Sequence, residues 1–120
     1  MVEFDPAHVV GAGGTIGAVL RYLVTSRVRS ASLPVGTFLV NVVGSFVLGF
    51  VTFLGADSQL LLLVGTGACG SFTTFSSFSV DTVRLWERGD PARAVGNAVA
   101  NLLGAVLALG FAWLLASALL

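Results

Sequence analysis

Charged side chains are scarce in this sequence, and lysine is missing from it altogether. Of its 120 residues, 10% are charged and 56% are hydrophobic, and the mean hydropathy is +0.97. A soluble domain would carry about 25% charged residues. The composition therefore predicts an all-α integral membrane protein. The length suits a single domain, 1–120, with four transmembrane helices of roughly 20 residues each.

Cysteine and histidine each occur once, as Cys69 and His8. A single cysteine cannot form an intrachain disulfide, and these two residues cannot assemble a His/Cys metal cluster. His8 lies at the very start of the chain, before the membrane interior, where a Ser–His–acid arrangement would need a histidine. The glycine pattern GTGACG precedes hydroxyl residues rather than the lysine of a nucleotide-binding loop. The sequence predicts that the protein is not an enzyme.

The four predicted spans cover about 6–25, 36–54, 60–86 and 92–118. The third contains GTGACGSFTTFSSFS, which is rich in glycine and hydroxyl residues and therefore poor material for one unbroken helix. A helix in lipid has to satisfy its backbone groups internally, so a loosened backbone is tolerated only where protein or a watery path surrounds it. We expect the third span to be broken near 70–75. Such a break usually marks an ion or substrate site; the alternative is a packing kink.

Polar residues in the second and third spans suggest a narrow polar path. Asn41 is the strongly polar residue inside the second span, with Thr37 and Ser45 one turn to either side. This stripe either lines a path or joins helices by hydrogen bonds. Phe75 and Phe78 are interleaved with hydroxyl residues, and aromatic rings are electropositive at their edges. Hydroxyls, amides and ring edges suit a small anion, whereas the carbonyls at the end of the first half-helix suit a small cation.

Small residues predict where helices approach closely. Gly13 and Gly17 form such a pair in the first span. The fourth span carries small residues at every fourth position, which predicts one continuous packing ridge: Gly96, Ala100, Gly104, Ala108, Ala112 and Ala116. Asn97 and Asn101 lie one turn apart near its start, and the sequence does not separate hydrogen-bonding glue from path lining.

Arginine is distributed unevenly. Arg21 lies near the end of the first span, where it either extends to the lipid headgroups or acts at a water-filled vestibule. The other five arginines lie in or next to two connections, the one between spans one and two and the one between spans three and four: Arg27, Arg29, Arg84, Arg88 and Arg93. The positive-inside rule predicts cytoplasmic connections there and both termini outside a cell membrane. Asp81 precedes Arg84 by one turn, which predicts a structural ion pair.

Two alternatives to an ion channel remain open at this point. A proton-coupled exporter of the small-multidrug type has a similar length and four spans, but it would need a carboxylate deep in span one, and none is present. A non-conducting membrane assembly subunit is supported by the small-residue ridge of span four and by the uneven arginines.

Three segments, GGTIGAVLRY, GTFLVNVVGSFVLG and GACGSFTTFSSFS, occur in this order on spans one to three. They resemble the fluoride-specific ion channels of the Fluc (CrcB) family over nearly the whole chain. The resemblance implies passive export of fluoride from the cytoplasm, which relieves fluoride toxicity, through an antiparallel dual-topology dimer with two pores. It also implies a structural sodium ion, not transported, at the dimer centre.

The same resemblance assigns roles to residues of this chain. It implies that the carbonyls of Gly70 and Thr73 hold the sodium ion and that the rings of Phe75 and Phe78 line the fluoride path. The other residues that it assigns are the pore amide Asn41, the path hydroxyls Ser79 and Thr74, and the vestibule arginine Arg21. The chain departs from the family pattern at Asp81, where members usually have Glu, and at Asn97 and Asn101, where they commonly have Tyr and Ser.

The uneven arginines also bear on the partner. A chain that inserts both ways to form an antiparallel homodimer should have nearly balanced loop charges, whereas this chain favours one orientation. We expect it to pair with a homologous chain of opposite bias; an antiparallel homodimer is the alternative.

Overall fold

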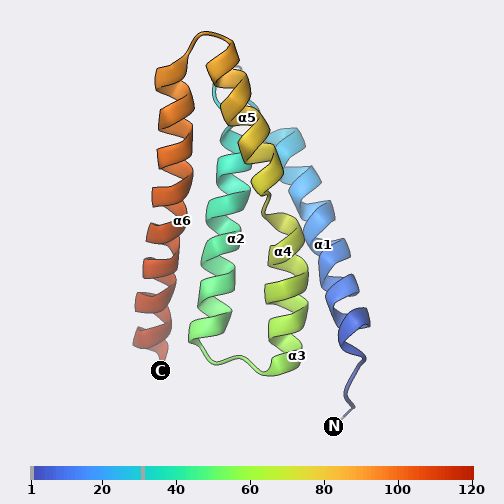
Figure 1. The fold of residues 1–120 in the computed structure, drawn as a ribbon. Coiled ribbons are helices and arrows are strands. Elements are labelled where there is room, and N and C mark those ends of the chain that lie inside the picture. The colour runs from blue at the N-terminus through green and yellow to red at the C-terminus, as the bar shows by residue number, and fades with distance from the viewer. Residues whose placement is uncertain (1, 31) are drawn as a thin grey trace.

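Four long helical segments lie side by side in the computed structural model, which describes residues 2–30 and 32–120 (Figure 1). They are α1 (Pro6–Arg27), α2 (Val35–Phe53), a composite third segment and α6 (Pro91–Leu119). The third segment consists of α3 (Ser58–Leu60), the π-helix η1 (Leu61–Cys69), α4 (Gly70–Phe72) and α5 (Phe75–Glu87). All regular structure in the described residues is helical. The predicted fold class, four membrane helices with the third interrupted, is confirmed.

The helices form a thin layer rather than a closed bundle. α1 packs on η1 and α4, η1 packs on α2, and α2 packs on α6, while α5 leans on α6. The layer measures 57 × 31 × 19 Å, and its smallest dimension is about two helix diameters or less. Both termini and the turn between α2 and α3 lie at one end, and the end of α5 and the start of α6 lie at the other (Figure 1). Both broad faces of the layer are therefore left open by this chain.

The interruption of the third segment falls at two threonines. Thr73 (φ −81°, ψ 158°) and Thr74 (φ −150°, ψ 117°) are extended. The Thr74 hydroxyl accepts a hydrogen bond from the Ser77 N–H at 3.1 Å and so caps α5. The glycines that suggested a break remain helical, in the wider turns of η1 and in α4. The sequence thus predicted the region of the break, but the capping threonine fixes its position.

Glycines bring α1 into close contact with the third segment, as predicted. A Cβ atom at Gly13 would overlap the Leu63 carbonyl oxygen, and one at Gly17 would overlap the Ala68 carbonyl oxygen and the Ser71 hydroxyl. The Ser71 hydroxyl donates to the Gly14 carbonyl at 2.7 Å across this contact. Close backbone approach, which only small residues permit, therefore holds α1 in place.

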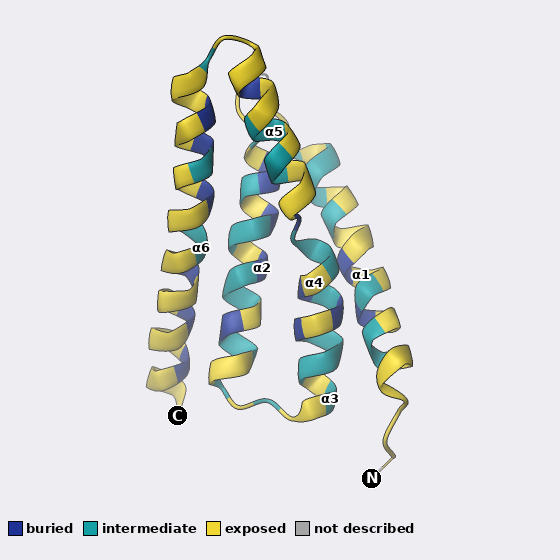
Figure 2. Ribbon diagram, viewed as in Figure 1, coloured by how far each residue is buried: buried dark blue, intermediate teal, exposed yellow. Residues whose placement is uncertain are grey.

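The small-residue ridge predicted on α6 is correct from Gly104 onward, where a Cβ atom would overlap the Val42 side chain of α2, and wrong before it. Ala108, Ala112 and Ala116 are buried, whereas Ala100 is exposed and a Cβ atom at Gly96 would contact nothing within 4 Å. A step of four residues advances about 40° beyond a full turn of a 3.6-residue helix, so a strict four-residue ridge winds away from its partner. In the first half the buried positions are Ala94, Asn97 and Asn101. Figure 2 shows the side of α6 that faces α2 in blue and its outer side in yellow.

The contact between α1 and the third segment predicts a difference between two glycines of α1. Gly17→Val should lower the free energy of unfolding by about 1–3 kcal/mol or more, because the added side chain meets backbone atoms that cannot move aside. Gly11→Val is the matched control, since a Cβ atom there meets nothing within 4 Å. Thermal unfolding in detergent measures both. Equal melting temperatures for the two variants would contradict the close contact.

Candidate functional site

Asn41 of α2 clamps the break of the third segment. The Thr74 N–H donates to Asn41 Oδ1 at 2.8 Å, and Asn41 Nδ2 donates to the Thr74 carbonyl at 3.1 Å. One carboxamide therefore satisfies both backbone groups of Thr74, much as a neighbouring strand would. In a membrane, where no water replaces lost helical hydrogen bonds, such a clamp is what permits the interruption.

The break releases the Gly70 carbonyl from its helical partner. In an unbroken helix the Thr74 N–H would donate to that carbonyl, but here it donates to Asn41. Gly70 is exposed, and a Cβ atom at this position would contact nothing within 4 Å. The carbonyl end of α4 therefore lies on an open face of the chain, at the negative end of a helical segment.

Arg21 reaches the same break from α1. Its Nη1 atom lies 3.4 Å from the carbonyl oxygen of Thr73, and the side chain is half-buried. Neither sequence interpretation of Arg21, headgroup contact or vestibule charge, included this contact. The Arg21 guanidinium contacts Thr73 from the α1 side, while Asn41 holds Thr74 from the α2 side.

The break opens into a depression of about 690 Å³ formed by α2, the third segment and α6, which we call the break depression. Most of the residues that the sequence assigned to an ion site line it: Asn41, Gly70, Thr73, Thr74, Phe75 and Phe78. Ser79 and Arg21 do not. Asn101 of α6, for which the sequence left open hydrogen-bonding glue or path lining, lines it as well. The structure thus brings together on one face residues that are up to 60 positions apart.

Two phenylalanine rings stand at the edge of the break depression. The centroids of Phe75 and Phe78 are 5.7 Å apart and their planes are inclined by 52°. Phe75 is 81% exposed, whereas Phe78 is half-buried. Since aromatic rings are positive at their edges, tilted rings can present edges to an anion. In the part of the chain that the structure describes, little besides Phe78 covers the Phe75 ring, which is therefore available to a ligand, to lipid or to another subunit.

The hydroxyls of this region are hydrogen-bonded within the chain. The Ser79 hydroxyl donates to the Phe75 carbonyl at 2.9 Å, and the Ser45 hydroxyl donates to the Asn41 carbonyl at 2.7 Å. The hydroxyls of Thr74 and Ser76 lie 3.4 Å apart. To donate to an anion, the hydroxyl of Ser79 or Ser45 would have to give up its hydrogen bond to a backbone carbonyl. Rotation of the hydroxyl is enough for this exchange, and the helix need not move.

The predicted ion pair between Asp81 and Arg84 is wrong. Asp81 instead accepts a hydrogen bond from the Thr37 hydroxyl of α2 at 2.9 Å, while Arg84 is exposed. The one ion pair among the described residues joins Asp90 and Arg93 at 3.4 Å. The Asp81 carboxylate thus binds a hydroxyl of the neighbouring helix α2, whereas residue spacing along α5 had predicted Arg84 as its partner. Thr37 and Asn41 both bond to the third segment, so two members of the α2 stripe join helices.

Asn97 and Asn101 continue the hydrogen bonding of Asn41 into α6. Asn41 Nδ2 lies 3.3 Å from Asn101 Oδ1, and Asn101 Nδ2 donates to the Asn97 carbonyl at 2.9 Å. Asn97 Nδ2 donates in turn to the Thr82 hydroxyl of α5 at 2.9 Å. The sequence had singled out both asparagines without deciding between glue and lining. Their spacing could have indicated hydrogen bonding between helices. Asn97 and Asn101 lie four residues apart, on the same buried side of α6 as Ala94 and Ala108.

Comparison with known proteins identifies the family of the chain. Residues 8–113 match the family model described as CrcB-like protein, Camphor Resistance (CrcB). The chain is 54% identical over 113 residues to a protein of Haloarcula marismortui named fluoride-specific ion channel FluC 2, covering 94% of this chain and 95% of that one.

Further relatives bear related names. A fluoride-specific ion channel FluC 1 of Halobacterium salinarum is 56% identical over 110 residues, with 92% of each chain covered. A fluoride-specific ion channel FluC of Thermotoga maritima is 45% identical over 112 residues, with 86% of this chain and 87% of that one covered. On the match to the family model and these identities, the chain belongs to the CrcB-like family.

Proposed function

We propose that this chain is a subunit of a fluoride-specific ion channel, through which fluoride leaves the cytoplasm passively. The observation that carries the proposal is that relatives more than 50% identical over more than nine-tenths of the chain are named as such channels. Because these relatives are named as channels, we prefer a channel to the two alternatives, a proton-coupled exporter and a non-conducting assembly subunit. A passive channel also suits a chain whose first span carries no carboxylate to exchange protons.

The proposed fluoride path runs along the break depression and α5. Phe75 and Phe78 offer ring edges, and Thr74 and Ser79 offer hydroxyls, while Asn41 lines the path and holds Thr74 in place. These groups can replace the water of a small anion without presenting a full positive charge that would trap it. Arg21 lies beside the break, in contact with the Thr73 carbonyl. Its positive charge would raise the electrostatic potential there and attract an entering anion, which is the vestibule role that we propose for it.

We further propose that two subunits pack antiparallel across the face that carries the break depression. The chain alone is a layer whose smallest dimension is 19 Å, and it leaves the ring of Phe75 and the carbonyl end at Gly70 on an open face. A released backbone carbonyl at membrane depth needs a partner, since lipid offers none. An inverted second subunit would bring its own break to the same place.

The proposed structural sodium ion would be held by the carbonyls of Gly70 and Thr73 from both subunits. The donor set suits such an ion, because unwound carbonyls at the end of a half-helix coordinate small cations in membrane proteins. The Gly70 carbonyl is released by the break, and the Thr73 carbonyl keeps a lone pair beside its 3.4 Å contact with Arg21. The ion would supply a fixed positive charge at the dimer centre.

The proposed orientation places the arginine-rich end in the cytoplasm and both termini outside the cell membrane. Arg27, Arg29, Arg84, Arg88 and Arg93 lie in or beside the two connections at that end. Because this bias fixes one orientation, we propose that the second subunit is a homologous chain with the opposite bias.

The proposed path predicts that Phe75→Ile and Phe78→Ile slow fluoride efflux from proteoliposomes about tenfold or more. Isoleucine fills similar space but has no electropositive ring edge, and each tenfold loss of rate corresponds to about 1.4 kcal/mol of barrier. A fluoride electrode measures efflux with the assembly reconstituted, and chloride efflux serves as the selectivity control. Efflux should be electrogenic and should need no pH gradient.

Phe111→Ile is the matched control, because Phe111 is an exposed ring of α6 that contacts Phe46 rather than the break. It should leave efflux unchanged. Wild-type rates in the Phe75 and Phe78 variants would mean that the two rings serve packing alone. Efflux that required a proton gradient would instead favour the exporter.

The sodium proposal predicts that exchange of Na⁺ for N-methylglucamine destabilises the assembly. A ligand that binds the folded state stabilises it by about 2.7 kcal/mol at a 100-fold excess over its Kd, so melting temperatures should rise with Na⁺ concentration. Thr73→Val should keep this dependence, because the proposed ligand is the backbone carbonyl and not the hydroxyl, which donates to the Cys69 carbonyl. A melting temperature that does not change with Na⁺ concentration would argue against the sodium site.

The arginine bias predicts a single orientation for the chain expressed alone. Single cysteines at Ser58 and at Glu87, placed in a Cys69→Ser background, should differ in reaction with an impermeant thiol reagent added outside: the Ser58 position reacts and the Glu87 position does not. Replacing the loop arginines with glutamine should make both positions react in part. An abundant antiparallel dimer of the wild-type chain without any partner would overturn the proposal of a second, homologous subunit.

A further inference from the structure

Three asparagines and a threonine form one continuous line of hydrogen bonds between α2, α6 and α5, which we call the amide ladder. It consists of Asn41, Asn101, Asn97 and Thr82, joined in that order at 3.3 Å, 3.2 Å (between the carboxamides of Asn101 and Asn97) and 2.9 Å. The ladder starts at the clamp on Thr74 and ends where the Thr82 hydroxyl donates to the Phe78 carbonyl at 2.8 Å. Both ends are thus attached to the segment at the start of α5.

Backbone groups fix the orientation of two carboxamides in the ladder. The Thr74 N–H can only donate, so Asn41 has to turn its oxygen toward it and its nitrogen toward Asn101. The Asn97 carbonyl can only accept, so Asn101 turns its nitrogen toward Asn97 and its oxygen toward Asn41. The two constraints agree, and neither carboxamide can flip without breaking a bond to the backbone.

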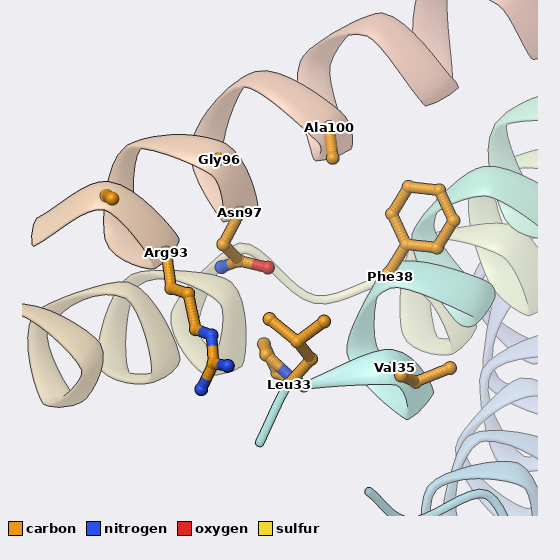
Figure 3. A pocket seen from close by; sticks show the side chains of 9 residues that line it. Leu33, Val35, Phe38, Arg93, Gly96, Asn97 and Ala100 are labelled. Carbon is orange, nitrogen blue, oxygen red and sulfur yellow. The ribbon is translucent and has the colours of Figure 1, made fainter. Parts of the chain in front are cut away.

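Within residues 2–30 and 32–120, the Asn97 side chain has hydrogen bonds only to Thr82 and Asn101. Its side chain also borders a separate depression of about 460 Å³ between the starts of α2 and α6, lined mainly by apolar residues such as Leu33, Val35 and Phe38 (Figure 3). Arg93, the charged residue of that lining, is paired with Asp90. Asn97 and Asn101 are each only 8% exposed, so a broken ladder would leave buried amides without partners.

The ladder uses the polar hydrogens of Asn41. One carboxamide has two N–H groups, and here they serve the Thr74 carbonyl and Asn101 Oδ1. Asn41 therefore acts on a passing anion through the position of the break rather than through a spare donor. The ring-bearing turns of α5 are held at two points, before Phe75 through Thr74 and at the Phe78 carbonyl through Thr82.

We propose that Asn97 and Asn101 are positioning residues for the fluoride path: acting through Asn41 and Thr82, they fix the backbone that carries Phe75 and Phe78. The inference rests on the proposed function, since it assigns a role in fluoride conduction to residues of α6. It also makes α6 more than a packing helix, because its buried face determines where the two rings stand.

The test combines efflux with hydrogen exchange in the reconstituted assembly. Asn101→Leu keeps the branched shape of the side chain but removes both ladder bonds, and it should slow fluoride efflux about tenfold or more. Amide exchange at Thr74 to Phe78 should quicken about tenfold or more in the same variant, while exchange in α1 stays as in the wild type. Asn101→Ser should restore part of both, because a serine hydroxyl can still donate to the Asn97 carbonyl.

A double-mutant cycle separates positioning from direct contact with the ion. Asn41→Leu removes the clamp on Thr74 as well as the ladder, so it should slow efflux at least as much as Asn101→Leu. The double variant should be no slower than Asn41→Leu alone, because Asn101 acts through Asn41. Thr52→Val is the control, since its exposed hydroxyl donates to the Leu48 carbonyl within α2; it should change neither readout.

Three outcomes would overturn the inference. Additive losses with unchanged exchange at Thr74 would mean that Asn101 contacts the ion directly. Exchange that quickens uniformly through all helices would mean that the asparagines contribute only to global stability. Unchanged efflux in Asn101→Leu would remove their role in conduction. A wild-type chain that conducts no fluoride, with its proposed partner present, would refute the proposed function instead, and the exchange data would still decide whether the ladder positions α5.

Discussion

The structure depends on one constraint: a backbone that leaves its helix inside a membrane has to find hydrogen-bond partners within the protein. The third segment leaves its helix at Thr73 and Thr74. Asn41 takes both backbone groups of Thr74, the Thr74 hydroxyl caps α5, and Arg21 contacts the Thr73 carbonyl. Each of these partners comes from a different element, so α1, α2 and α5 have to be placed correctly before the break can exist.

This arrangement explains why polar residues are few but concentrated. The three amide side chains of the spans either bond to the break or support a residue that does: Asn41, Asn97 and Asn101. Among the described residues no buried side-chain nitrogen or oxygen lacks a partner, as expected where an unpaired amide would face hydrocarbon. The apolar remainder supplies shape, through the glycine contact between α1 and the third segment and the alanines of the second half of α6. Polar bonds fix the break, and small residues bring the helices close enough to make those bonds.

Hydropathy and residue spacing predicted the four helices, the interruption and the close contact at Gly13 and Gly17, because each depends on local composition. They attributed the break to glycine and hydroxyl residues together, whereas in the structure η1 absorbs the glycines in wider turns and only the capping threonine ends the helix. The Asp81–Arg84 pair failed for a related reason: spacing along one helix does not reveal a donor such as Thr37 on the next. The partners of Asn97 and Asn101 were likewise undecided, because they depend on how α6 is rotated against α2 and α5.

Two features of the chain place opposite demands on a second subunit. The carbonyl end at Gly70 and the exposed ring of Phe75 would be completed by a subunit that carries the same break and runs in the opposite direction. The arginines, gathered at one end, oppose insertion of this same chain in that direction, because each would have to be moved to the other side of the membrane. A homologous chain that keeps the break residues but carries its arginines at the other end meets both demands. The break would then be the shared part of the two sequences, and the loop charges the part in which they differ.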